Sequence, residues 1–227
     1  MRLSIIIPAY NEARTIGTLI ERVQSVQLEG YEKEIIVVDD GSKDETSAIA
    51  KRSGVIVVVH PKNRGKGAAV RTGFEKATGK YVVVQDADLE YDPNDFRAML
   101  RCAKEKGAQV IYGSRRLPRA NEKPNRGAWY FYAGGLLLTI LTNILYRTRI
   151  TDEPTCYKMI HRDVLKKIRL TAEGFEFCPE ITAKIARLGI PIYEVPISYA
   201  PRSVAEGKKI RLRDWFIAVW TLLKNRL

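Results

Sequence analysis

At residues 82–90 the chain reads VVVQDADLE, an apolar run that passes directly into two aspartates one residue apart and then a glutamate. A short valine run of this kind predicts a buried strand, and the polar residues mark the point where that strand ends. Asp86, Asp88 and Glu90 place several carboxylate oxygens in a small volume, where they repel one another unless a cation lies between them. Mg²⁺ and Mn²⁺ bind in this way, through one or two carboxylates and the phosphate oxygens of a substrate. These residues alone leave one alternative open, which is a solvated acidic turn before Pro93.

The stretch belongs to a longer alternation of strand-like and helical segments. Strand-like runs occur at Leu3–Pro8, Glu34–Asp39, Val55–Val59, Tyr81–Gln85 and Val110–Tyr112. Helical spacing predicts helices between them at Thr15–Val26, Asp44–Ser53, Gly67–Ala77 and Pro93–Lys106, the last of which ends at Gly107. Continuous valine and isoleucine runs separated by helices indicate an α/β fold, with a mostly parallel sheet and helices on both faces.

Four polar segments follow the strand-like runs. They are residues 10–12 (YNE), 39–42 (DDGS), 63–67 (NRGKG) and 86–88 (DAD). Ligands of open parallel sheets bind at the carboxyl ends of the strands, so these segments are expected to meet at one rim. Any one of them could be an ordinary loop, but four at one rim favour a nucleotide-binding site.

Two common nucleotide-binding motifs do not occur in the sequence. A dinucleotide-binding fingerprint needs G-x-G-x-x-G directly after the first strand, where this chain has PAYNE at residues 8–12. A P-loop needs G-x-x-x-x-G-K-[ST], and residues 65–68 (GKGA) lack both the spacing and the hydroxyl. Nicotinamide-dependent chemistry and Walker-type ATP chemistry are therefore not expected.

Composition narrows the class of protein. With 227 residues, of which 45% are hydrophobic, the chain is long enough for one domain with a substantial core. Its three cysteines form no C-x-x-C pair, so neither a zinc site nor a disulfide framework is predicted, and a reducing, cytosolic setting is expected. The first apolar run is too short for a signal peptide. A net charge of +12 favours nucleic acid, anionic lipid or a phosphorylated substrate, and because no nucleic-acid-binding motif is found, no nucleic-acid partner is expected.

Five motifs together give the chain a family resemblance. They read IPAYNE at 7–12, VDDGS at 38–42, NRGKGA at 63–68, QDADL at 85–89 and GSR at 113–115. In this combination the chain resembles the inverting glycosyltransferases of family 2. Residues 152–158, 174–180 and 194–209 resemble the branch of dolichol-phosphate mannose synthases and polyprenyl-phosphate glycosyltransferases. The resemblance implies a Rossmann-like GT-A fold as a single domain over residues 1–227. Residues 1–115 would form the nucleotide-sugar-binding half, and residues 116–227 the half that faces the acceptor and the membrane.

The resemblance also implies roles for individual residues at the donor site. The substrate-binding set would comprise Pro8, Tyr10, Glu12 and Asp39 around the base and ribose, together with Lys66, Asp86 and Ala87. A tyrosine ring offers a stacking face, and a carboxylate accepts hydrogen bonds from base N–H groups or sugar hydroxyls. Asp86, Asp88 and Glu90 are the expected ligands of Mg²⁺ or Mn²⁺ on the diphosphate. Relatives often have glutamine at position 90, so Glu90 either tightens metal binding by its added charge or faces solvent.

Four basic residues are candidate phosphate partners. They are Arg115, Arg126, Arg202 and Lys208. Guanidinium groups match phosphate oxygens in bidentate fashion, although in so basic a chain a surface charge is the alternative for each residue. The resemblance aligns Arg202 with a phosphate-binding arginine, and Arg115 follows the fifth strand-like run. We therefore expect Asp88, Arg115 and Arg202 to carry the catalytic roles.

The expected reaction needs few groups. In an inverting transfer the acceptor attacks the anomeric carbon from the face opposite the leaving nucleoside diphosphate. A hydroxyl acceptor needs a general base, whereas a polyprenyl phosphate is already an anion and can be held by a divalent ion and arginines. His60 and His161 are expected to be structural. Glu176 and Glu180 are the alternative base candidates, and Glu180 could instead cap a helix.

We therefore expect metal-dependent transfer of a sugar from a nucleotide sugar to a polyprenyl (dolichyl or undecaprenyl) phosphate. GDP-mannose is the favoured donor, and UDP-glucose and UDP-N-acetylglucosamine stay open because no residue identifies the sugar. Two alternatives remain. One is a soluble polysaccharide or protein acceptor, which would require a base, and the other is a non-catalytic scaffold at the membrane surface.

Residues 128–146 (AWYFYAGGLLLTILTNILY) carry no charge and lie between Arg126 and Arg147. As a helix they would measure about 28 Å, close to the thickness of a bilayer core. One polar stripe would run along this helix, formed by Thr139, Thr142, Asn143 and Tyr146. We expect an amphipathic helix in the membrane interface rather than a buried or a spanning one, because a span would separate the later motifs from the catalytic face.

The C-terminal segment is basic and aromatic. Residues 202–227 carry seven lysines and arginines against two acidic residues. Within them, Trp215–Leu223 is uncharged but too short to span, and its tryptophans suit the level of the lipid headgroups. We expect a cytoplasmic protein that is peripheral on the inner, cytosolic face of a membrane with anionic lipid. A membrane-anchoring subunit and a homodimer stay open as further partners.

Overall fold

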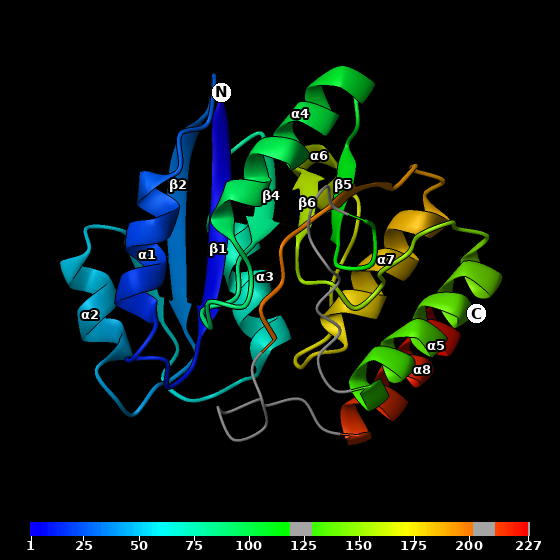
Figure 1. Cartoon of the computed structure of the whole chain (residues 1–227). Helices are drawn as coiled ribbons and strands as arrows, with labels where there is room; N and C mark the ends of the chain where they lie inside the picture. Colours follow the sequence, from blue (N-terminus) through cyan, green and yellow to red (C-terminus); the bar gives the residue numbers. More distant parts are fainter. Residues whose placement is uncertain (119–128, 202–211, 227) are drawn as a thin grey trace.

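The computed structural model describes residues 1–118, 129–201 and 212–226 of the chain (Figure 1). Within these residues it contains the strands β1 (Arg2–Ala9), β2 (Glu32–Asp39), β3 (Ile56–Val59), β4 (Tyr81–Val84), β5 (Val110–Ser114), β6 (Lys158–His161) and β7 (Tyr193–Pro196). The helices are α1 (Ile16–Ser25), α2 (Thr46–Arg52), α3 (Lys66–Lys76), α4 (Phe96–Lys106), α5 (Trp129–Tyr146), α6 (Arg162–Leu165), α7 (Phe177–Arg187) and α8 (Leu212–Arg226), and a 3-10 turn η1 (Pro93–Asp95) precedes α4.

The strands form one sheet in the order β3-β2-β1-β4-β6-β5-β7. Strand β6 is antiparallel to both β4 and β5, whereas the pairs β1–β2, β1–β4, β2–β3 and β5–β7 are parallel. The predicted α/β fold with a mostly parallel sheet is therefore confirmed. All five predicted strands are present, and β6 and β7 extend the sheet beyond them.

Strand β1 lies inside the sheet, and helices cover it on both faces. Its residues Ile5, Ile6 and Ile7 are fully buried. Ile5 and Ile7 pack in one cluster with the apolar faces of α1 and α4, whereas Ile6 packs on the other face, against α3. Helix α3 approaches so closely that a Cβ atom on Gly73 would lie 2.2 Å from Ile6 Cγ2. This close packing fixes the position of α3 against β1.

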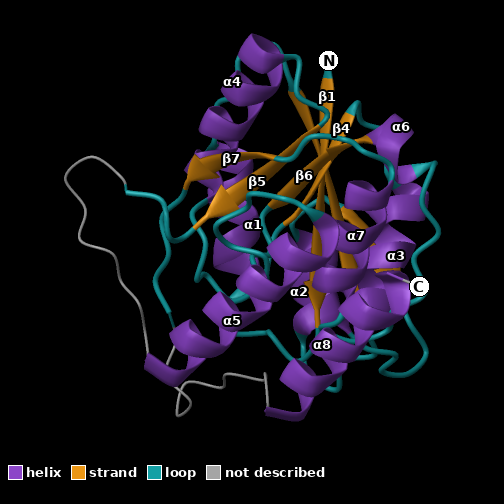
Figure 2. Ribbon diagram, turned by 90° about the vertical axis from the view of Figure 1, so that its right-hand side faces the viewer, coloured by secondary structure: helices purple, strands orange, loops and turns teal. Residues whose placement is uncertain are grey.

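Helices α5 and α8 lie side by side against α7, beside the half of the sheet that contains β5 (Figures 1 and 2). The three helices share a small core of Leu138, Ala183, Ala218 and Leu222. This layer is separate from the clusters that pack directly on the sheet.

The polar stripe of α5 faces the protein. Thr139 is 3% exposed, and its Oγ1 accepts a hydrogen bond from the Glu153 amide at 3.0 Å. At the end of the helix the Tyr146 hydroxyl donates to the Leu222 carbonyl of α8 at 2.6 Å. The stripe therefore satisfies polar groups of the neighbouring segments, which would otherwise be costly to bury.

Leu138 of α5 is buried in the small core shared with α7 and α8, but another part of the apolar surface of α5 is exposed. Leu137, Ile140 and Ile144 of α5 are 58%, 45% and 71% exposed, and Phe216 and Trp220 of α8 are 60% and 63% exposed. We call these five residues the α5–α8 face. The alternative of a fully buried helix is therefore wrong. None of the described helices has the length and hydropathy needed to cross a membrane.

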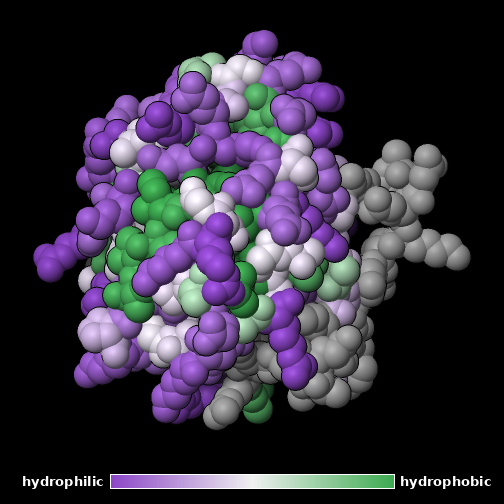
Figure 3. Space-filling view, turned by 90° about the vertical axis from the view of Figure 1, so that its left-hand side faces the viewer, coloured by the Kyte–Doolittle hydropathy of each residue, from purple (hydrophilic) through white to green (hydrophobic). Residues whose placement is uncertain are grey.

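The opposite edge of the sheet is formed by β3. It exposes Ile56 and Val59, which are 48% and 47% accessible. The surface on this side shows an apolar area among hydrophilic residues (Figure 3). Because β3 and the α5–α8 face lie on opposite sides of the molecule, β3 provides a matched apolar control for substitutions in that face.

Candidate active site

The loops after β1 and β2 are tied together by hydrogen bonds. The Asn11 amide donates to Ser42 Oγ at 2.9 Å, and Asn11 Oδ1 accepts from the Lys43 amide at 2.9 Å. The Glu12 amide donates to Thr46 Oγ1 at 2.9 Å. The first two of the four predicted polar segments therefore meet at one rim, as parallel strands predict.

Four residues predicted to border the base and ribose lie at this rim. Pro8, Tyr10 and Glu12 are partly exposed, and Asp39 is 1% exposed. Asp39 Oδ1 accepts a hydrogen bond from the Ser42 amide at 2.9 Å, which closes the turn after β2. Contacts of these residues with a nucleotide stay predictions.

Asp40 shapes the loop that leads to α3. Its Oδ1 accepts from the Arg64 amide at 3.0 Å, and its Oδ2 accepts from the Gly65 amide at 2.7 Å. His60 Nδ1 lies 2.7 Å from Asp40 Oδ1, and His60 Nε2 lies 3.0 Å from Thr72 Oγ1. His60 therefore has a structural role, as expected, whereas sequence reasoning did not single out Asp40.

The start of α3 places Lys66 against the acidic segment. Lys66 Nζ lies 2.6 Å from Asp86 Oδ1 and donates to Cys156 Sγ at 3.1 Å. The same ammonium group lies 5.5 Å and 5.8 Å from the ring centroids of Phe175 and Phe177. Burial alone would lower the pKa of Lys66, but the adjacent Asp86 carboxylate outweighs burial and raises that pKa well above its usual value. Lys66 therefore places a positive charge next to the acidic segment that follows β4.

Residues 171–176 pack directly on the start of α3, and two glycines make this possible. A Cβ atom on Gly65, whose φ is +97°, would lie 2.3 Å from the Glu173 carbonyl oxygen. A Cβ atom on Gly67 would lie 2.6 Å from the Ala172 carbonyl oxygen. The Ala68 amide donates to the Glu173 carbonyl at 3.2 Å, so the loop satisfies a free amide of the first turn of α3.

The acidic segment after β4 forms a tight turn. Asp88 Oδ1 accepts from the Glu90 amide at 3.1 Å, and Leu89 has a positive φ of 64°. Glu90 is 8% exposed, and its Oε2 accepts from the Tyr199 hydroxyl at 2.6 Å. The alternative in which Glu90 faces solvent is therefore wrong, while its role as a metal ligand stays a prediction. Ala87, between the two aspartates, is buried.

The donor set at this turn suits a hard divalent cation. Asp86 Oδ1 is buried, and the Lys66 ammonium lies 2.6 Å from it as the counter-ion. The described side chains bring together no group of three histidines, cysteines, aspartates or glutamates that could hold a metal by themselves. Mg²⁺ is usually bound with a nucleotide through one or two carboxylates, and phosphate oxygens complete its coordination shell. The carboxylates of Asp86 and Asp88 fit this arrangement.

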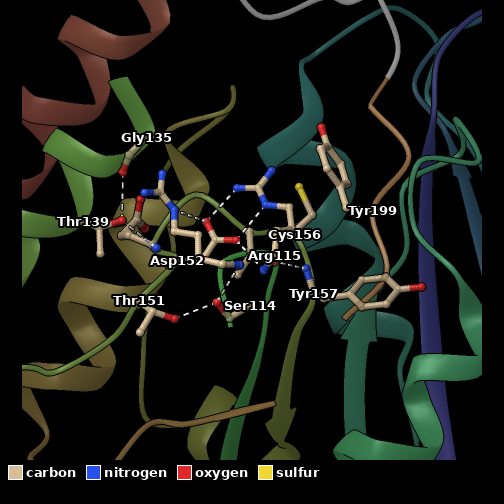
Figure 4. Close-up of polar contacts among 12 residues, drawn as sticks. Ser114, Arg115, Gly135, Thr139, Thr151, Asp152, Cys156, Tyr157 and Tyr199 are labelled. Carbon is tan, nitrogen blue, oxygen red and sulfur yellow. Dashed lines mark hydrogen bonds and ion pairs between the residues drawn. The ribbon is translucent and has the colours of Figure 1, made fainter. Parts of the chain in front are cut away.

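Arg115 is held by a buried carboxylate at the end of β5 (Figure 4). Its amide, Nε and Nη2 donate to Asp152 at 3.0, 2.7 and 2.8 Å, and its guanidinium group lies 5.0 Å from the Tyr199 ring centroid. Asp152 is fully buried, and Arg116 Nε lies 3.8 Å from its Oδ1. Burial would raise the pKa of Asp152, but Arg115 outweighs burial and holds that pKa below its usual value.

A second buried ion pair lies behind this carboxylate. Lys158 Nζ lies 3.9 Å from Glu153 Oε1, donates to the Glu153 carbonyl at 2.6 Å, and lies 3.9 Å from the centroid of the Tyr112 ring. Burial raises the pKa of Glu153. Sequence reasoning assigned no role to Asp152 or Glu153, because their partners Arg115, just after β5, and Lys158, on β6, become neighbours only in the folded protein.

The two alternative base candidates have structural partners. Glu180 is 2% exposed and accepts hydrogen bonds from the amides of Thr171 and Ala172, at 2.9 and 2.8 Å, and from Lys184. Burial would raise the pKa of Glu180, but these hydrogen bonds outweigh burial and lower it. Glu176 Oε1 accepts from two backbone amides of the same loop. Both carboxylates hold the loop that packs on α3.

Replacing Glu180 with glutamine is expected to change stability more than chemistry. Loss of the charge weakens the bonds to Thr171, Ala172 and Lys184, so the melting temperature should fall by about 4 °C. The turnover rate should fall by less than about threefold, whereas loss of a general base costs about a hundredfold or more. Thermal unfolding and turnover measured beside the exposed control Glu173→Gln separate the two roles. A hundredfold loss of turnover in a folded variant would restore Glu180 as a base.

Three predicted phosphate partners lie outside the described residues. These are Arg126, Arg202 and Lys208, which fall in residues 119–128 and 202–211. Their contacts with phosphate stay predictions. Arg115 is the predicted phosphate partner whose surroundings the structure describes.

Comparison with known proteins gives consistent matches over most of the chain. The family model described as glycosyl transferase family 2 matches residues 4–169. An uncharacterized protein of Methanocaldococcus jannaschii is 32% identical over 213 residues, which cover 91% of this chain and 85% of that protein. The undecaprenyl-phosphate mannosyltransferase of Micrococcus luteus is 28% identical over 250 residues, which cover 100% of this chain and 99% of that enzyme.

Solved structures share the fold. The glucosyl-3-phosphoglycerate synthase of Mycobacterium tuberculosis, in complex with Mn²⁺, uridine diphosphate and phosphoglyceric acid, gives a TM-score of 0.75. The match covers 99% of this chain and 78% of that chain at 22% sequence identity. At this level of identity the similarity concerns the arrangement of strands and helices.

Proposed function

The chain belongs to glycosyl transferase family 2, and from this premise we propose that it transfers a sugar from a nucleotide sugar to a polyprenyl phosphate at a membrane surface. As a member of this family, the chain is a glycosyltransferase with a nucleotide-sugar donor. The observation that carries the proposal is the acidic turn Asp86–Asp88, which lies next to Lys66 at the carboxyl end of β4.

The donor is assigned to the rim formed by the loops after β1, β2 and β4. Asp86 and Asp88 would hold Mg²⁺ or Mn²⁺ together with the diphosphate, and Glu90 would support the turn through Tyr199. When bound, the ion offsets the negative charge that develops on the leaving nucleoside diphosphate. The substrate-binding set of Pro8, Tyr10, Glu12, Asp39, Lys66 and Ala87 keeps its predicted roles toward the base, ribose and diphosphate.

The acceptor phosphate is assigned to Arg115. Two nitrogens of its guanidinium side chain donate to Asp152, which fixes the plane of the group and leaves Nη1 for a phosphate oxygen. A phosphate acceptor attacks as an anion and needs no base, which agrees with the structural roles of Glu176 and Glu180. Arg126, Arg202 and Lys208 keep their predicted roles toward phosphate.

The α5–α8 face is assigned to the membrane surface. Leu137, Ile140, Ile144, Phe216 and Trp220 expose apolar side chains, and the cations Arg147, Arg149, Lys224 and Arg226 are exposed near the ends of the two helices. Apolar side chains flanked by cations are typical of proteins that bind anionic lipid without spanning it. We propose peripheral attachment on the cytosolic side, where the polyprenyl phosphate would meet the site.

Charges placed in the α5–α8 face are expected to weaken membrane binding strongly. The double variant Ile144→Asp and Trp220→Glu should lower binding to vesicles with anionic lipid at least about tenfold, because both side chains are mostly exposed and would otherwise insert. Co-sedimentation with vesicles measures this, and Ile56→Glu on β3 is the matched control. If the double variant stays folded and binds vesicles as the wild type does, another surface attaches the protein.

The proposed function is tested by one transfer assay. Radiolabelled GDP-mannose, UDP-glucose and UDP-N-acetylglucosamine are incubated in turn with a polyprenyl phosphate, with Mn²⁺ or with EDTA. Metal-dependent label in the organic phase from one donor supports the proposal. The Micrococcus luteus relative, a mannosyltransferase by name, favours GDP-mannose, whereas the uridine diphosphate in the mycobacterial structure keeps UDP-sugars open. Donor hydrolysis without label in the lipid would favour a soluble acceptor instead.

A further inference from the structure

Lys66 occupies a position that is built around its ammonium group. Its Nζ lies 2.6 Å from Asp86 Oδ1 and 3.1 Å from Cys156 Sγ, and the rings of Phe175 and Phe177 face it at under 6 Å. The side chain is 17% exposed, so the position is close to solvent without being open to it.

The carboxylate of Asp86 can pair with either of two cations, the Lys66 ammonium or a divalent metal ion. Asp86 Oδ1 is buried, and the Lys66 ammonium at 2.6 Å compensates its negative charge. Asp86 is also the proposed metal ligand. Two cations on one carboxylate repel each other, and in a partly buried site this repulsion is screened less than in water.

We propose that Lys66 is an exchangeable counter-ion of Asp86, which it neutralises in the empty site and leaves when a divalent ion binds. The proposal rests on the proposed function, since it places the metal and the diphosphate at Asp86. The lysine side chain has a flexible four-carbon stem, so its ammonium can move to a diphosphate oxygen while the backbone of α3 stays in place. Lys66 therefore opposes metal binding by the empty enzyme and supports diphosphate binding by the metal-loaded enzyme.

If Lys66 has this role, its removal should strengthen Mn²⁺ binding and weaken nucleotide binding, whereas loss of a purely structural residue should weaken both. Lys66→Met keeps most of the side-chain volume against Phe175 and Phe177 but removes the charge. Binding of Mn²⁺ alone, followed by electron paramagnetic resonance, should become about tenfold tighter. Calorimetry then measures the binding of GDP and of UDP at saturating Mn²⁺. The nucleotide that the enzyme uses should bind about tenfold more weakly to Lys66→Met than to the wild type.

Two further variants complete the comparison. Lys62→Met removes the charge of an exposed lysine four residues earlier and should change neither affinity. In an Asp86→Asn background, Lys66→Met should no longer tighten Mn²⁺ binding, because the carboxylate for which the two cations compete is gone. Unchanged or weaker Mn²⁺ binding by folded Lys66→Met would overturn the proposal.

A measurement on the wild-type enzyme keeps the proposal testable if the variant does not fold. Reductive methylation followed by mass spectrometry reports how accessible each lysine amine is. Mn²⁺ should raise the labelling of Lys66 about threefold, because the amine is released from Asp86, and added nucleoside diphosphate should lower it again. Labelling of Lys66 that does not respond to Mn²⁺ would contradict the exchange.

These measurements do not involve the acceptor. Failure to transfer sugar to a polyprenyl phosphate would remove the proposed acceptor and leave the exchange at Asp86 standing. Absence of the opposite-sign effects in an enzyme that does transfer sugar would remove the exchange alone.

Discussion

Replacing Asp88 with alanine is expected to lower kcat/KM for sugar transfer about a thousandfold, because the divalent ion on the diphosphate would lose one of its two proposed carboxylate ligands. The substitution also removes the hydrogen bond that Asp88 accepts from the Glu90 amide two residues later, and such a bond contributes about 1 kcal/mol to stability. The loss should therefore appear in kinetics and in metal affinity rather than in the melting temperature.

The same loop offers a matched control for this variant. Asp92 also accepts a hydrogen bond from the amide two residues later, that of Asn94, at 3.0 Å. Asp92→Ala removes the same kind of turn interaction outside the proposed metal site, so it should retain transfer within about threefold. Activity would be measured across a range of Mn²⁺ concentrations. If Asp88→Ala transfers sugar at the rate of the Asp92 control, the proposed metal site is in the wrong place.

Replacing Asp152 with alanine is expected to destabilise the protein by roughly 3–5 kcal/mol, the cost of breaking a buried ion pair and leaving its partner uncompensated. Asp152 is fully buried and accepts three hydrogen bonds from Arg115. For a chain of this size the melting temperature should fall by about 10 °C. Urea unfolding gives the free energy directly, and transfer should also fall because Arg115 loses its orientation.

A surface ion pair provides the control for Asp152. Asp163 lies 3.3 Å from Lys166, and both side chains are 62% exposed. Asp163→Ala should cost less than about 1 kcal/mol, since exposed pairs contribute little. If Asp152→Ala lowers the free energy of unfolding as little as Asp163→Ala does, another group must compensate the charge of Arg115.

The stabilisation by Asp152 should depend on pH in a defined direction. Arg115 holds the pKa of Asp152 in the folded protein below its usual value, despite burial, so the charged form favours folding. This contribution is complete above the unfolded-state pKa of about 4 and is lost as the pH falls through the lower folded-state pKa. The difference in unfolding free energy between wild type and Asp152→Asn should therefore be constant from pH 7 to 5 and shrink below about pH 4. A difference that grows in acid would contradict the sign of the pKa shift.

Sequence reasoning predicted the strands β1 to β5 from hydropathy, because uninterrupted valine and isoleucine runs are typical of a sheet covered by helices. The edge strand β3 differs from the others in leaving Ile56 and Val59 half exposed. Strands β6 and β7 did not follow. Strand β6 begins with Lys158, which is 1% exposed, and its burial depends on Glu153 and the Tyr112 ring. A lysine in a short segment predicts exposure unless its partners are known.

In the candidate site, too, some contacts were predictable from the sequence and others were not. The carboxyl ends of parallel strands share an edge, so sequence order was enough to bring Asn11 near Ser42. The neighbours of Lys66 and Arg115 were not predictable, because Cys156 and Asp152 lie 90 and 37 residues away along the chain. Glu90 is a further case, since its partner Tyr199 comes from a segment 109 residues later.

The sequence by itself predicted an apolar helix over residues 128–146 with one polar stripe, and the structure contains the helix α5 at Trp129–Tyr146. Tertiary structure alone decided which side faces the protein. Hydropathy favours burial of all the apolar residues of the helix, yet the stripe is buried beside Leu138 while part of the apolar surface is exposed. The stripe is buried because Thr139 and Tyr146 bond to backbone groups of other segments. A periodic pattern distinguishes the two sides of a helix, but the side that is buried depends on which partners the rest of the fold provides.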